Sequence, residues 1–116
     1  MTTRIGHDHP DVVTRAVTLE RYAATDRPEI RLEEAPELED GDVVRIVIEG
    51  TEYRARITAR QDGTLVIRGV YETPRLARNP GDGTDYLPTW IETHDLSWGR
   101  TVHLDVVEPG FRYGLR

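Results

Sequence analysis

Arginine is the residue type whose placement in this sequence most directly suggests chemistry. The stretch VVRIVIEGTEYRARI, residues 43–57, carries Arg45, Arg54 and Arg56 on what its pattern predicts to be one β-hairpin. All 15 basic residues are arginine, and residues 41–80 hold 7 of them against 5 acidic residues, although the whole chain has a net charge of −6. A guanidinium offers a planar fork of donors that fits a phosphate group, so this clustering suggests an anion-binding surface.

The length of the first turn decides which of these arginines are neighbours. A two-residue loop at Glu49-Gly50 places Arg45 opposite Arg54, whereas a loop at Gly50-Thr51 places it opposite Arg56. Like charges that face each other across two strands cost roughly 0.2–1 kcal/mol. A sheet that collects them therefore needs a compensating anion, either from the protein itself or from a ligand.

The second turn extends the same face. If Gln61-Asp62-Gly63 is a three-residue loop with Gly63 in the left-handed conformation, Ile57 pairs with Ile67 and Arg56 faces Arg68. We favour this register because it keeps both isoleucines on the core side of the sheet.

Two interpretations of these arginines remain open. In the first, they form a face that binds nucleic acid or another polyanion. In the second, carboxylates such as Glu52, Glu72 and Asp42 neutralise them, in surface ion pairs that contribute little individually. The candidate binding residues of the first interpretation are Arg45, Arg54, Arg56, Arg68, Arg75, Arg78, Asn79, His103 and Arg112.

Other residue types that could bind a metal or take part in catalysis occur in weaker patterns. The His7-Asp8-His9 segment holds metal-ligand types, but no partner His stands at a helical spacing, so we expect no metal site. His103 and Asp105 would share one strand face about 7 Å apart. The chain has no cysteine, and its only serine, Ser97, is not in a Gly-x-Ser-x-Gly turn, so no activated nucleophile is evident. We therefore expect no cofactor and no catalytic residues, and lean against an enzyme.

Alternation of apolar and polar residues predicts the strands that carry the candidate side chains. We expect strands at residues 14–21, 29–32, 43–48, 51–57 and 65–70, and a second hairpin over residues 102–115. Two short helices are also predicted. Thr73 would cap the first, with Pro74 at its first position and Asn79-Pro80-Gly81 ending it. The second would cover Pro88–Thr93, with Asp85 as its cap.

Two segments of the chain echo each other at an offset of 58 residues. They are LEDGDVVRIVIEGTEYRARI from Leu38 and LSWGRTVHLDVVEPGFRYGL from Leu96. We interpret them as two related β-hairpin units, in which His103 and Arg112 take the places of Arg45 and Arg54. The inward-facing set of the second unit is predicted to be Val102, Leu104, Val106, Phe111, Tyr113 and Leu115.

Short motifs resemble known families. The spacing in Leu38-Glu39-Asp40-Gly41-Asp42 resembles the turn that precedes a strand in AbrB-like and B3-like pseudobarrels, many of which bind DNA. The whole chain, through ARNPGDG and VVEPGFRYGLR, is similar to an uncharacterised family of small haloarchaeal proteins. That resemblance implies a halophilic cytoplasm and carries no function with it.

Together these observations predict a mostly β fold, a small β-barrel or pseudobarrel with two short helices, over residues 11–116, after a flexible N-terminus at residues 1–10. No apolar run is long enough to span a bilayer, and no signal sequence is present, so we expect a cytoplasmic protein without a membrane partner. The favoured function is nucleic-acid or polyanion binding through the arginine-rich sheet face. The alternative is a protein-interaction or structural module that forms a homodimer, with a sheet edge at Phe111–Arg116 that pairs between subunits.

Overall fold

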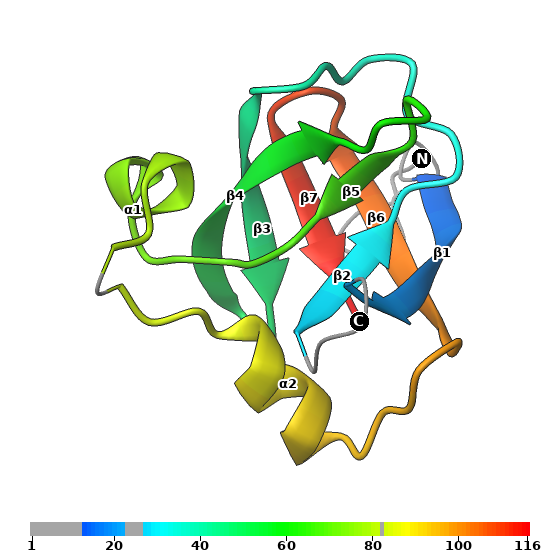
Figure 1. The fold of residues 1–116 in the computed structure, drawn as a ribbon, viewed down its shortest axis with the longest axis vertical. Helices are drawn as coiled ribbons and strands as arrows, with labels where there is room; N and C mark the ends of the chain where they lie inside the picture. The colour runs from blue at the N-terminus through cyan, green and yellow to red at the C-terminus, as the bar shows by residue number, and fades with distance from the viewer. Residues whose placement is uncertain (1–12, 23–26, 82) are drawn as a thin grey trace, which may run out of the picture.

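A closed barrel of seven strands forms the body of the protein (Figure 1). The computed structural model describes residues 13–22, 27–81 and 83–116. Around the barrel the strands follow the order β1-β2-β5-β4-β3-β7-β6, and β6 pairs back onto β1. The prediction of a mostly β barrel with two short helices is confirmed. The elements are β1 Val13–Arg21, β2 Pro28–Arg31, β3 Val43–Ile48, β4 Thr51–Ala59, β5 Leu65–Ile67, α1 Pro74–Arg78, α2 Leu87–Thr93, β6 Thr101–Glu108 and β7 Arg112–Leu115.

Some of the predictions fall outside this range. The His7-Asp8-His9 segment and the N-terminus expected to be flexible lie beyond the described residues. Within the described ranges, no helix is long and apolar enough to cross a membrane.

Strict alternation along β3 divides its residues between the core and the outer surface. Val44, Ile46 and Ile48 are buried in the barrel core, while Val43, Arg45 and Val47 between them face outward and are partly exposed. This period of two is what allows a strand to bury one face and hydrate the other. It also places every arginine of the predicted hairpin on the outside of the barrel.

Both predicted turns have the geometry that the register required. Glu49 and Gly50 have φ angles of 51° and 83°, as in a type I′ turn, and Arg45 is the direct partner of Arg54. The first of the two registers considered for this hairpin is therefore the one observed. Gly63 has a φ of 91°, and Ile57 pairs with Ile67 as expected.

Strand β7 corrects two expectations. It lies between β3, with which it pairs in parallel, and β6, with which it pairs antiparallel, so Phe111–Arg116 does not present a free sheet edge. Phe111 was expected in the core but is 46% exposed. The β6–β7 ladder shifts register between Val106 and Glu108, and β7 begins only at Arg112, which leaves Phe111 in the turn.

The two turns that precede β3 and β6 have the same local structure. Gly41 and Gly99 have φ angles of 98° and 87°, in the left-handed region that favours glycine. In the first turn the Asp42 N–H donates to the carbonyl of Glu39, and 58 residues later the Arg100 N–H donates to that of Ser97. This agreement is local, and the relation between the two hairpin units as a whole stays a prediction.

The helices lie outside the barrel wall and across one of its ends. The Thr73 hydroxyl accepts a hydrogen bond from the Leu76 N–H, which confirms the predicted cap of α1, and α1 packs against β4. Helix α2 lies below the barrel in Figure 1 and buries Leu87 and Trp90 against the core. Asp85 stabilises the start of α2 by accepting from the Leu87 N–H, although Tyr86 occupies the cap position itself.

Candidate functional site

Three arginines lie side by side across three neighbouring strands. Arg54 on β4 is the direct partner of Arg45 on β3, and Arg45 is in turn the partner of Arg112 on the parallel strand β7. We call these three residues the arginine row. Because adjacent strands are about 4.8 Å apart, the row concentrates three positive charges on a narrow band of the outer surface.

One carboxylate bridges the whole row. Glu52 Oε2 accepts hydrogen bonds from Nη1 of Arg45 at 3.2 Å and Nη1 of Arg54 at 3.1 Å. Its other oxygen, Oε1, accepts from Nε of Arg112 at 3.3 Å. Arg112 Nη1 also donates to Glu108 at 3.2 Å. Two carboxylates therefore face three guanidinium groups, and the local charge stays positive.

An exposed aromatic ring belongs to the same surface. The guanidinium carbon of Arg45 lies 4.5 Å from the centre of the Phe111 ring, and that of Arg112 lies 5.3 Å from it. These distances are within the range of cation–π attraction. The Nε atom of Arg45 is buried and has no hydrogen-bond partner. Phe111 thus fixes two members of the arginine row while keeping almost half of its own surface open to solvent.

Other candidate residues extend this face. Arg56 follows Arg54 on the outer side of β4, opposite Val43, and is exposed. Arg75, Arg78 and Asn79 are exposed on and after α1, the helix that packs against β4. Within residues 13–22, 27–81 and 83–116, none of the arginines at 56, 75 and 78 forms an ion pair.

Arg68 and His103 lie in other surroundings. Arg68 follows the last residue of β5, and its Nε donates to the buried Glu29 at 2.8 Å while its guanidinium covers the ring of Tyr22. His103 lies on β6, where its backbone pairs with that of Arg116. The structure therefore brings Arg45, Arg54 and Arg112 together and places Arg68 and His103 apart from them.

The network around Glu29 is built for stability. Glu29 is 2% exposed, and its two carboxylate oxygens accept hydrogen bonds from Arg60 and Arg68. Arg60 also donates to Glu20 at 2.6 Å, so two acids and two arginines join β1, β2 and the ends of β4 and β5. A buried carboxylate is tolerated only when it is paired in this way.

A second network, which the sequence did not reveal, ties two loops to the barrel. Arg15 forms two hydrogen bonds to the carboxylate of Glu37, which also accepts from the hydroxyl of Tyr113. Burial alone would raise the pKa of Glu37, but the hydrogen bonds from Arg15 and Tyr113 bring it below its ordinary value. Burial and the bond to Glu37 raise the pKa of Tyr113 to about 12.

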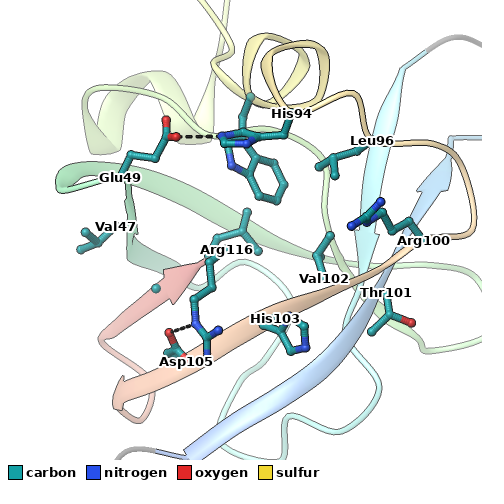
Figure 2. Close-up of a pocket in the computed structure, with 13 residues that line it drawn as sticks. Val47, Glu49, His94, Leu96, Arg100, Thr101, Val102, His103, Asp105 and Arg116 are labelled. Carbon is teal, nitrogen blue, oxygen red and sulfur yellow. Dashed lines mark hydrogen bonds and ion pairs between the residues drawn. The ribbon is translucent and has the colours of Figure 1, made fainter. Parts of the chain in front are cut away.

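A groove of about 670 Å³ opens on the outer surface beside α2 (Figure 2). Its residues come from β3 and the β3–β4 turn, α2, the loop that follows it, β6 and β7, which are far apart in the sequence. The alternation of apolar and polar residues within any one segment therefore could not indicate this groove. Residues that sequence reasoning missed and that line this groove are Glu49, His94, Arg100, Gly114 and Arg116.

His103 and Asp105, which were predicted to share one strand face, both line the groove, but Asp105 is bonded to other residues. The carboxylate of Asp105 accepts from Nε of Arg116 at 2.9 Å and from the Thr14 hydroxyl at 2.6 Å. Burial raises its pKa, yet these hydrogen bonds bring it below the ordinary value, so Asp105 stays ionised. Across the residues that the structure describes, no group of three or more His, Cys, Asp or Glu side chains could hold a metal ion.

Comparison with known proteins identifies one relationship. A family model described as "Family of unknown function (DUF7112)" matches residues 1–116. No curated protein and no solved structure matches the chain. A whole-chain match of this kind agrees with the expected uncharacterised family, while the haloarchaeal origin and the likeness to AbrB-like barrels stay predictions.

Proposed function

Because the chain belongs to this DUF7112 family of unknown function, its own geometry is the basis for a function, and we propose that it binds nucleic acid or another polyanion through the arginine row and Phe111. The observation that carries this proposal is the adjacency of Arg45, Arg54 and Arg112 on three neighbouring strands. Only Glu52 and Glu108 oppose them in the described part of the chain.

The donors of the arginine row exceed the acceptors that the protein supplies. Each guanidinium has about five N–H donors, and the hydrogen bonds to Glu52 and Glu108 use only a fraction of them. Apart from the buried Nε of Arg45, phosphate oxygens can take the remaining donors without displacing either carboxylate. In the absence of a ligand, Glu52 reduces the repulsion between the arginines and keeps them in place.

Phe111 favours a single-stranded ligand over a duplex. Stacking of a base on an aromatic ring contributes about 1–3 kcal/mol and requires an unpaired base. Phe111 is 46% exposed beside two arginines, so a phosphate and the base next to it could contact this surface together. Arg56 and the arginines of α1 would contact neighbouring phosphates.

The proposal is tested by measuring how affinity depends on salt. Fluorescence anisotropy with a labelled oligothymidylate and with a random duplex would be followed across a salt series. For single strands the slope of log affinity against log salt is about −0.7 per neutralised phosphate, so the R45A/R112A double variant should flatten it by about 1.4.

Arg21→Ala is the matched control, because this exposed arginine on β1 makes no ion pair among the described residues and lies off the row. It should leave the slope close to that of the wild type. An R45A/R112A slope equal to that of the wild type, or the absence of binding at the lowest salt where the protein stays folded, overturns the proposal.

A second candidate function is self-association. Val13, Val107 and Phe111 are each about half exposed, and the ladder pairs Val13 with Val106, next to Val107. A partner subunit could cover these side chains and supply carboxylates to the arginine row. Since β7 is paired on both sides, such a dimer would form through side chains and not by strand addition. Sedimentation velocity over a range of concentrations tests it, and a monomer at the highest concentration contradicts it.

A further inference from the structure

We propose that the groove beside α2 is a second binding site, which takes a small organic anion with an aromatic or apolar body. Its volume of about 670 Å³ lies within the range of about 300–1,000 Å³ that is typical of ligand sites. The groove is separate from the arginine row, so this proposal does not depend on whether the arginine row binds a polyanion.

The floor of the groove is a position without a side chain. Gly114 lies on β7 between Val47 of β3 and Asp105 of β6. The residues two places before and after it on the outer face, Arg112 and Arg116, have long side chains, so Gly114 leaves a depression between them.

Glycine is not required at this position by the backbone. Gly114 does not have a left-handed φ, and a Cβ placed there would meet its nearest neighbours, Cβ and Oδ2 of Asp105, at 3.6 Å, an ordinary van der Waals distance. The consequence of glycine at position 114 is therefore the open space above the sheet.

The walls of the groove are apolar and are held in place. Val47 and Leu96 contribute partly exposed apolar surface, and Trp90 also lines the groove but is only 3% exposed. The carboxylate of Glu49 contacts Nε2 of His94 at 2.7 Å (Figure 2). It also accepts from the Tyr86 hydroxyl at 3.3 Å, so both ends of α2 are attached to the β3–β4 turn. This attachment fixes the distance between α2 and the sheet, which keeps the groove open.

The polar groups that remain free to contact a ligand are cationic or neutral. Both carboxylates of the groove have hydrogen-bond partners, Arg116 for Asp105 and His94 for Glu49, although the Glu49 side chain stays 49% exposed. Arg100 is exposed and makes no ion pair within the described ranges, and His103 is exposed on β6. An anionic group placed between Arg100 and His103 would gain charge-assisted hydrogen bonds without displacing an existing pair.

The first test uses three probes of one shape. 2-Naphthoate and 2-naphthyl phosphate carry the two anionic groups that the site could accept, and 2-naphthol is neutral at pH 7. In ¹H–¹⁵N NMR titrations we expect saturable shifts of the Trp90 indole N–H with one or both anions, while Trp98, which does not line the groove, serves as an internal reference. The anion that binds more tightly shows whether the site prefers a carboxylate or a phosphate group.

We expect 2-naphthol to bind at least tenfold more weakly than the tighter-binding naphthyl anion, because charge-assisted hydrogen bonds are about twice as strong as neutral ones. Equal affinities for all three probes overturn the anionic assignment. Chemical-shift changes that centre on the arginine row, or that do not saturate, would show that the groove is not a binding site for these anions.

Two substitutions link the binding to the groove. Gly114→Leu would fill the depression and should weaken binding of the tighter-binding naphthyl anion at least tenfold. Gly114→Ala, which the 3.6 Å spacing accommodates, should have a smaller effect on this binding. Arg100→Ala should weaken it about five- to tenfold through loss of a charge-assisted bond. The matched control Arg21→Ala removes an exposed arginine on β1 outside the groove and should leave this affinity unchanged.

These variants keep the inference falsifiable even if Gly114→Leu does not fold, since Arg100→Ala changes only an exposed side chain. Unchanged affinity in Arg100→Ala contradicts the inference. The R45A/R112A variant should bind the naphthyl anions as the wild type does. A groove that binds no anion can therefore be told apart from an arginine row that binds no polyanion.

Discussion

Arg45 and Arg112 are direct partners on the parallel strands β3 and β7, and a single carboxylate, that of Glu52, accepts a hydrogen bond from each of them. The two like charges would repel each other if this acceptor were absent. Glu52 therefore has opposite effects on stability and on binding, because it holds the arginines together and also reduces their attraction for an external anion.

Replacing Glu52 by Gln should separate these two effects. We expect the free energy of unfolding to fall by about 1 kcal/mol, as the side chain loses its charge but keeps its shape. Affinity for oligothymidylate at low salt should rise two- to fivefold, which corresponds to roughly 0.5–1 kcal/mol. Chemical denaturation and anisotropy measure the two quantities. Glu92→Gln, which removes the same charge from an exposed position on α2, is the control.

If the arginine row served only to stabilise the barrel, Glu52→Gln would reduce stability and leave the affinity unchanged. A fall in affinity that accompanies the fall in stability would also contradict the proposed function.

Phe111→Ala should reduce affinity without unfolding the protein. The side chain lies in a turn and is 46% exposed, so we expect a stability loss below about 1 kcal/mol. Loss of one stacked base would weaken oligothymidylate binding by about 1–3 kcal/mol and affect the duplex much less. Val107→Ala, which truncates another half-exposed apolar residue, should leave both affinities unchanged. An equal loss on single-stranded and duplex DNA would argue against stacking.

The sequence limited the register of the β3–β4 hairpin to two alternatives, because the register depends on local structure. The alternation of Val44, Ile46 and Ile48 permits only one face to be buried, which allows either Arg54 or Arg56 opposite Arg45. The type I′ turn observed at Glu49-Gly50 selects Arg54. The same reasoning predicted the cap of α1 at Thr73.

The position of Arg112 beside Arg45 could not be predicted in this way. It results from parallel pairing of β3 with β7, a contact between segments that are far apart in the sequence and for which no turn specifies the register. Phe111 was misplaced for a related reason, because a register shift in the β6–β7 ladder interrupts the alternation that the sequence pattern assumes. The groove depends on several such long-range contacts at once.

Glu29 should be one of the most sensitive positions for stability. It is 2% exposed and accepts hydrogen bonds from Arg60 and Arg68. Glu29→Ala would leave Arg68 without its carboxylate acceptor and Arg60 with Glu20 alone, and since both arginines retain partial access to water, we expect a loss of about 2–3 kcal/mol. Arg68→Ala should cost less, because Arg60 still pairs with Glu29. Denaturant midpoints measure both variants, and a Glu29→Ala protein as stable as the wild type would contradict the assigned role.

Tyr113 should make the protein sensitive to alkaline pH. The hydroxyl of Tyr113 donates to Glu37 and accepts from the Gly110 N–H, and its pKa is raised to about 12, from an ordinary value of about 10. A raised pKa means that the folded state binds the proton more tightly. The contribution to stability is therefore fully present below pH 10 and is lost as the pH rises towards 12, by up to roughly 3 kcal/mol.

Tyr113→Phe removes this group and tests the sign of the effect. The variant should be less stable by about 1–2 kcal/mol at pH 7, because the Gly110 N–H and Glu37 each lose a partner. Between pH 10 and 12 its stability should decline less steeply than that of the wild type, so the two unfolding curves converge. Other tyrosines are present in both proteins and contribute equally to the decline. Parallel curves over this range, measured by urea denaturation, would show that Tyr113 does not titrate with folding.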